Sequence, residues 1–120
     1  MSHTHIATSF LKLASSGLAE DAFDKYVHPD FFHHNQYFKG DRQSLKEAMK
    51  EAHQSSPNRA FDIKHTYGDG DTVITHSHVS KEDAEIAVVH IFRFRGDKIM
   101  EMWDLGQVIR EDSPNINGPF

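Results

Sequence analysis

Beyond Pro57 the chain consists of four extended segments separated by turns of only a few residues. The segments cover residues 61–67, 72–79, 86–94 and 99–108, and the first of them alternates apolar and polar side chains with a period of two. Polar turns at 68–71, 80–83 and 95–98 separate the segments. Strands joined so tightly must be antiparallel neighbours. The sequence therefore predicts a four-stranded meander, and its third strand is apolar enough to be central.

The part of the chain before Pro57 has a helical periodicity instead. A first helix is capped by Ser2 or Thr4 and ends at Gly17, and a second covers residues 18–27 and is ended by Pro29. A third helix follows its N-cap Asp41 and ends at 55–57, and residues 31–35 form a short extended piece before it. Helices followed by a meander predict an α+β fold in which the helices cover one face of a curved antiparallel sheet.

The composition excludes several classes of protein. A chain of 120 residues is expected to be one domain, 1–120, with an irregular tail at 110–120. It has no cysteine, which removes disulfide scaffolds and thiol nucleophiles, and its formal charge of -5 argues against a nucleic-acid binder. With no apolar run near about 18 residues and no secretory signal, we expect a cytoplasmic protein that does not contact a membrane.

The polar residues within the extended segments are the candidates for chemistry. His34, His76 and His90 interrupt three such segments, and Asp104 lies beside Met, Trp and Leu on the fourth. A carboxylate in such a place is costly unless it is hydrogen-bonded or partly wet, and apolar surroundings make a carboxyl group a usable general acid or base near neutral pH. If the faces of the four segments converge, these four residues line one cavity and are its catalytic residues.

Other interpretations of these residues stay open. A single strand histidine is more often structural than catalytic, and Asp104 could simply hold Trp103 or a turn amide. His76 and His78 share a strand face, so that with His90 or Asp104 they have the composition of a 2-His-1-carboxylate site, but no helical ligand pattern supports it and we predict no metal. His33 and His34 are strand neighbours, so only one of them can point inward.

Parts of the sequence resemble the SnoaL-like family of the NTF2-like superfamily, and the resemblance spans nearly the whole chain. The residues that carry it are Tyr26-Val27-His28-Pro29-Asp30-Phe31 with His33-His34-Asn35, and Val89-His90-Ile91-Phe92-Arg93-Phe94 with Gly96-Asp97-Lys98-Ile99 and Glu101-Met102-Trp103-Asp104. The tail, with Asp112-Ser113-Pro114-Asn115 and Asn117-Gly118, resembles that of an uncharacterised bacterial subgroup.

The resemblance implies a cone-shaped fold with three N-terminal helices over the concave face of the sheet, a deep pocket and a homodimer. It also implies that Asp104, which matches the acid/base residue of polyketide cyclase members, works without a cofactor, and that His34 and Asn35 match the family's His-Asn pair. Met102 stands where many members have His, and His90 where relatives often have Asp, so the set of proton-relay residues differs.

These observations lead to three hypotheses about function. The first is a small enzyme without cofactor that performs acid/base chemistry, such as an aldol cyclisation or an isomerisation, on an apolar carbonyl compound. The second is a module that only binds a small apolar molecule in the same pocket, and the third is a structural protein with a vestigial cavity. The residues expected to contact the ligand are Asn35, Phe32, Tyr37, Met102, Trp103 and His78.

Overall fold

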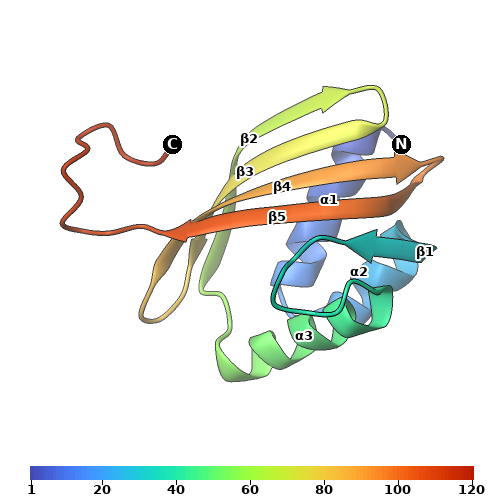
Figure 1. Cartoon of the computed structure of the whole chain (residues 1–120), viewed down its shortest axis with the longest axis horizontal. Coiled ribbons are helices and arrows are strands. Elements are labelled where there is room, and N and C mark those ends of the chain that lie inside the picture. The colour runs from blue at the N-terminus through green and yellow to red at the C-terminus, as the bar shows by residue number, and fades with distance from the viewer.

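Three helices and five strands make up the fold (Figure 1), in a computed structural model that describes residues 1–120. The helices are α1 (His3–Ser15), α2 (Ala19–Tyr26) and α3 (Arg42–Ser55). The strands are β1 (Val27–His33), β2 (Ala60–Asp69), β3 (Thr72–Ser80), β4 (Glu85–Arg95) and β5 (Lys98–Val108). They form one open sheet in the order β1-β5-β4-β3-β2. The predicted α+β class is confirmed.

Strand β1 differs from the sequence-based prediction. It begins at Val27, directly after α2, instead of at Phe31, and it pairs in parallel with β5 at the edge of the sheet. The remaining neighbours are antiparallel, as the tight turns required. Pro29 lies within β1, which is tolerated because an edge strand need not donate every ladder hydrogen bond. The sheet therefore has a fifth strand, and this strand leads directly into the residues that reach Asp104.

The helix ends follow the predicted capping residues. Ser2 Oγ accepts a hydrogen bond from the backbone N–H of His5 at 3.1 Å, and Asp41 Oδ2 accepts one from Ser44 at 3.0 Å. Gly17 ends α1 with a φ of 95°, which favours glycine, and a Cβ there would clash with the ring of His53 on α3. Gly17 thus lets the α1–α2 turn approach α3 closely.

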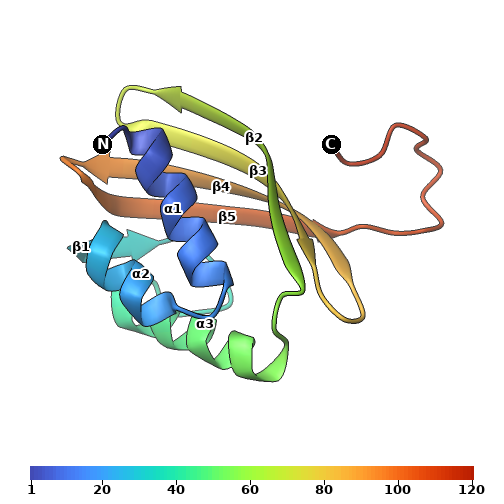
Figure 2. The same cartoon turned by 180° about the vertical axis from the view of Figure 1, so that it is seen from behind.

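The helices pack on one face of the sheet, which we call the inner face (Figure 2). Phe10 of α1 contacts Phe23 of α2 and Phe92 of β4 edge-on, with ring centroids 5.6 Å and 6.0 Å apart. Each fully buried aromatic or aliphatic side chain of this kind stabilises the fold by roughly 1.5–3 kcal/mol. Along the strands the buried side chains alternate, so that Val73, Phe92 and Met102 belong to the inner face.

The opposite face of the sheet, the outer face, is not covered by any helix (Figure 1). Residues 109–120 contain no helix or strand; they leave the end of β5 and hook back, so that the ring of Phe120 lies 4.8 Å from that of His76. None of the three helices is long and apolar enough to cross a membrane.

Candidate functional site

His90 and Asp104 lie directly opposite each other on β4 and β5, on the inner face of the sheet. Thr75 of β3 is the partner of His90 on its other side, so the three side chains form one row across three strands. Directly opposed residues of antiparallel strands have Cβ atoms about 4.5–5.5 Å apart. His90 and Asp104 are thus cross-strand neighbours, and the catalytic role predicted for them stays a proposal.

Asp104 is held by the loop that follows β1. Asn35 Nδ2 donates a hydrogen bond to Asp104 Oδ2 at 3.0 Å, while Asn35 Oδ1 accepts one from the backbone N–H of Tyr37 at 2.9 Å. The second contact fixes which end of the amide faces the carboxylate. Asp104 Oδ1 has no hydrogen-bond partner in the protein, so this oxygen is free to accept a proton.

His33 holds this loop in place. Its side chain is buried, its Nδ1 accepts a hydrogen bond from the backbone N–H of Asn35 at 3.1 Å, and its Nε2 lies 2.7 Å from the carbonyl oxygen of Lys39. Because Nδ1 accepts, the neutral ring carries its proton on Nε2 and donates it to Lys39. His33 is therefore a positioning residue for Asn35, and through Asn35 for Asp104.

The buried polar atoms of the inner face lack protein partners. The Nδ1 of His90 and the hydroxyl oxygens of Thr75 and Ser77 are buried without a hydrogen bond. Burial lowers the pKa of His90 from its ordinary 6.5 to about 4, although the nearby Asp104 carboxylate acts in the opposite direction. His90 is consequently neutral near pH 7. A buried polar atom without a partner is uncommon, and here three of them face the helices together.

His90 and Asp104 line two different hollows. His90 lines a cleft between α1, α3 and the start of β2, with a cavity volume of about 140 Å³ that is partly open to solvent. Asp104 lines a groove beside the loop after β1, together with Asn35 and Tyr37. One member of the cross-strand pair faces each hollow. A small molecule that spans both would contact the imidazole and the carboxylate at once.

His34 points to the outer face, although it is also one of the residues that line the groove. Its Nε2 donates a hydrogen bond to Glu101 Oε2 at 2.6 Å, and its ring stacks on Trp103 at 4.7 Å. Arg93 Nε donates to the other oxygen of Glu101 at 2.7 Å. Burial of Glu101 alone would raise its pKa, but these two hydrogen bonds lower the pKa below its ordinary value. The expectation that His34 points toward Asp104 is wrong, because His33 takes the inward position.

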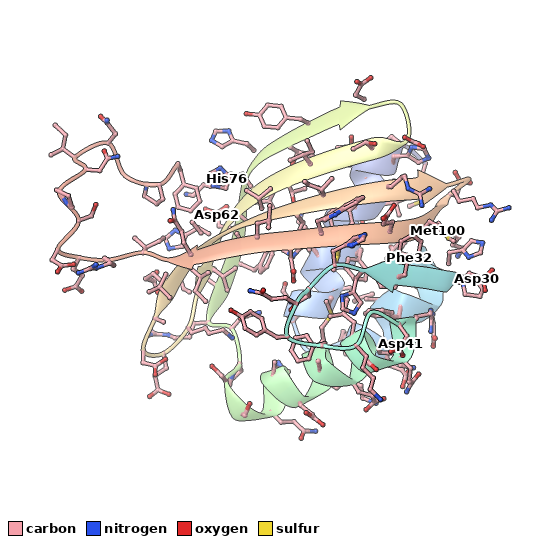
Figure 3. All side chains as sticks on the ribbon, viewed as in Figure 1. Asp30, Phe32, Asp41, Asp62, His76 and Met100 are labelled. Atoms are coloured by element: carbon pink, nitrogen blue, oxygen red, sulfur yellow. The ribbon has the colours of Figure 1, made fainter.

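His76 and His78 also lie on the outer face, where the ring of Phe120 stacks on His78 at 5.3 Å and lies tilted against His76 at 4.8 Å. In Figure 3 His76 lies beside the returning tail, whereas Phe32 lies on β1. The inner positions of β3 are taken by Val73, Thr75, Ser77 and Val79. The expected convergence of His76 with Asp104 is therefore wrong, since the sheet separates the two side chains.

The same separation affects the alternative metal site. His76 and His78 lie across the sheet from His90 and Asp104, so they cannot form a three-residue site with either of them. No group of three or more His, Asp or Glu side chains lies close enough to hold a metal ion.

The residues expected to contact a ligand are divided in the same way. Asn35 and Tyr37 line the groove, and Met102 is fully buried in the core on the inner face. Trp103 and Phe32 lie near His34 on the outer face. Sequence reasoning did not single out His33, Thr75 or Ser77. The alternation of β3 offered a signal for Thr75 and Ser77, because they share a face with Val73 and Val79.

Comparisons with known proteins agree with this architecture. A family model described as a SnoaL-like domain matches residues 9–102. An NTF2-like protein of unknown function from Burkholderia xenovorans superimposes with a TM-score of 0.76 at 16% identity, covering 93% of this chain and 88% of that one. A proposed polyketide cyclase from Acidithiobacillus ferrooxidans gives 0.72 at 22% identity, covering 88% and 89%.

A further solved structure, AclR from Streptomyces galilaeus, a proposed hydroxylase, gives a TM-score of 0.74 at 14% identity and covers 88% of each chain. No curated protein matches the sequence. Identities this low show the fold alone, whereas the family model covers most of the chain. The chain therefore belongs to the SnoaL-like family, within the NTF2-like fold.

Proposed function

We propose that this protein is a small enzyme, independent of any cofactor, that moves a proton at the carbon beside the carbonyl group of an apolar compound. The observation that carries the proposal is the cross-strand pair of His90 and Asp104, with Asn35 bound to the carboxylate. A neutral buried donor next to a positioned carboxylate suits the formation of an enolate.

Each residue has a separate part in the reaction. The free Oδ1 of Asp104 takes the proton from the carbon, while Asn35 keeps Oδ2 in place. The electron pair of the broken C–H bond moves onto the carbonyl oxygen, and a hydrogen bond from the neutral imidazole of His90 stabilises the negative charge that develops there. The enolate then recovers a proton from Asp104 at the same or another carbon. Alternatively, its carbon attacks a second carbonyl group of the same molecule in an aldol closure, and the alkoxide that forms takes the proton from Asp104.

Exchange of hydrogen for deuterium tests the proton transfer without knowledge of the natural substrate. A panel of apolar ketones, with 2-tetralone as the first member, is incubated with the protein in D₂O, and deuterium incorporation is followed by proton NMR. The expected result is exchange beyond the buffer rate, lost by at least about hundredfold in Asp104→Asn. Asp97→Asn, in the exposed turn between β4 and β5, is the matched control and keeps the activity.

Two outcomes contradict the enzyme assignment. If Asp104→Asn exchanges as fast as the unmodified protein, the carboxylate is not the base. If no ketone of the panel exchanges faster with protein than in buffer, while a neutral apolar dye still binds in the cleft, the second function applies, namely binding of a small apolar molecule. That alternative is favoured by one observation: the apolar cleft is lined by His90 but not by Asp104.

We also propose that the outer face of the sheet forms a homodimer. Ile74, Leu105 and Tyr67 are apolar or aromatic and exposed there or along its edges, and no helix covers this face. An uncovered apolar patch on a sheet commonly marks an association surface. Light scattering should give twice the mass of 13.7 kDa, and Leu105→Glu should return the protein to a monomer. A monomer at all concentrations would rule this out.

A further inference from the structure

We infer that the cleft beside His90 takes an apolar carboxylic acid, whose carboxylate lies at the cleft mouth near Lys81 and Arg59. This inference rests on the proposed function, because it names a class of ligand for the same site. It adds a charge requirement that the acid/base chemistry alone does not impose.

The walls of the cleft are apolar because α3 continues its apolar stripe beyond the core. Leu45 is buried, Met49 is half-buried and Ala52 is exposed, so the second half of α3 does not pack on the sheet (Figure 2). The apolar residues that line the cleft are Phe10, Leu11, Ala14, Met49, Ala52 and Phe61. Apolar surface left open between two helices and a strand is stabilised by an apolar occupant.

The inner end of the cleft requires a polar atom from its occupant. His90 is only 8% exposed and its Nδ1 has no hydrogen-bond partner. Leaving such a group without a partner costs roughly as much as a lost hydrogen bond. Because Nδ1 is itself buried, a carbonyl or hydroxyl oxygen of a ligand restores the missing bond only if the His90 ring turns toward the cleft; such an oxygen fits the carbonyl compound of the proposed function.

The mouth of the cleft is basic. His53 and Lys81 line it, and Lys12 and Arg59 line an adjoining depression that shares Ser15, Asn58 and Phe61 with the cleft. Neither lining contains Asp or Glu. The formal charge of the whole chain is -5, so this local excess of positive charge does not follow from the composition.

The cations at the mouth are free to bind an anion. Lys81 Nζ donates one hydrogen bond, to the carbonyl oxygen of Ser56 at 2.6 Å, and can donate two more. Lys12, Arg59 and Lys81 take part in no salt bridge, in contrast to Lys46, Lys64 and Arg93. Glu82 and Asp83 do not line the cleft; they line a neighbouring depression that shares Ser56 with it and that Arg59 also borders.

The helix ends explain why the anion should carry a single charge. Both α1 and α3 end at the mouth, at Ser15 and Ser55, and a helix C-terminus carries partial negative charge. These dipoles oppose a dianion such as a phosphate monoester more than a carboxylate. A guanidinium group also matches the two oxygens of a carboxylate in geometry.

Octanoate and 1-octanol form a matched pair of probes, because they differ mainly in the charged head. Their affinities are measured at pH 8 by displacement of the neutral dye N-phenyl-1-naphthylamine. We expect octanoate to bind about tenfold more tightly than 1-octanol. The double variant Lys81→Met with Arg59→Gln should abolish this preference and leave the affinity for 1-octanol unchanged. Arg95→Gln, at the opposite end of β4, is the control and should keep the preference.

A filling variant shows whether the cleft is the binding site. Ala52 is exposed and lines the cleft, so Ala52→Phe should lower both affinities without disturbing the core. Equal binding of the two probes by the unmodified protein, a preference that survives in the double variant, or full affinity in a folded Ala52→Phe protein would each overturn the inference. Asp104→Asn should bind octanoate with unchanged affinity. A failure of the proposed proton transfer can therefore be distinguished from a failure of carboxylate binding.

Discussion

The polar side chains on the two faces of the sheet differ in whether they have hydrogen-bond partners. On the outer face Glu101 accepts hydrogen bonds from both His34 and Arg93, and Glu85 accepts from both His78 and Ser80. On the inner face the buried polar atoms of Thr75, Ser77 and His90 have no protein partner, although burial makes each of them costly. The buried polar atoms of the inner face therefore lack the partners that the polar side chains of the outer face have. The comparison points to the inner face as the functional one.

Among the variants that test the difference between the two faces, His90→Phe is expected to have the largest effect. The substitution removes the donor proposed to stabilise the enolate, so exchange of the ketone in D₂O should fall by about hundredfold. It also removes a buried atom without a partner, so the free energy of unfolding should stay the same or rise by about 1 kcal/mol. Exchange rates and urea unfolding measure the two quantities. Loss of activity accompanied by strong destabilisation would mean that His90 is structural.

Lowering the pH should reduce the free energy of unfolding through protonation of His90. His90 takes up a proton below pH 6.5 in the unfolded chain, but only near pH 4 in the folded one. The stability contribution is therefore complete above pH 6.5 and is lost as the pH falls toward 4, by about 3 kcal/mol. Urea unfolding at a series of pH values should show this slope, and His90→Phe should flatten it. An equal slope in both proteins would place the titration elsewhere.

Glu101→Gln breaks the outer network and should affect only stability. Glu101 is largely buried between His34 and Arg93, and the amide offers each of them a weaker contact. The expected loss is about 1–2 kcal/mol near pH 7, with exchange activity unchanged. Because the pKa of Glu101 is lowered in the folded protein, this stabilisation should disappear as the pH falls below about 4.5. A loss of activity at full stability would show that the outer face takes part in catalysis.

The smallest effect is expected from His76→Gln. The ring contacts Phe120 of the tail and lies on the outer face, so the change should alter stability by no more than about 0.5 kcal/mol and leave exchange intact. Thermal unfolding and the D₂O assay are sufficient. Strongly reduced exchange would show that His76 takes part in the reaction. The chemistry would then not be confined to the inner face.

Local patterns in the sequence predicted most of the fold but not the edge strand. Capping at Ser2 and Asp41 and the turns between β2 and β5 are local signals, and the structure follows them. The parallel pairing of β1 with β5 joins residues about 70 positions apart and has no local signature. Alternation also placed Met102 and Asp104 together correctly, because the pleat alone decides which residues share a face.

The candidate site was harder to predict, since alternation says which residues share a face but not which face is inner. β3 carries apolar residues on both sides, so Val73 and Ile74 gave conflicting signals and His76 was expected to point inward. For His33 and His34 the choice depended on the register between β1 and β5. That Thr75 and Ser77 are buried without hydrogen-bond partners can be recognised only when the packing of the helices is known.

The most direct test compares two amide substitutions on the same strand. Asp104→Asn and Glu101→Gln each replace a carboxylate of β5, but the first lies on the inner face and the second on the outer face. The measurement is the rate of deuterium incorporation into 2-tetralone in D₂O. We predict a loss of at least about hundredfold for Asp104→Asn and an unchanged rate for Glu101→Gln. Equal rates for the two variants would contradict the assignment of the chemistry to the inner face.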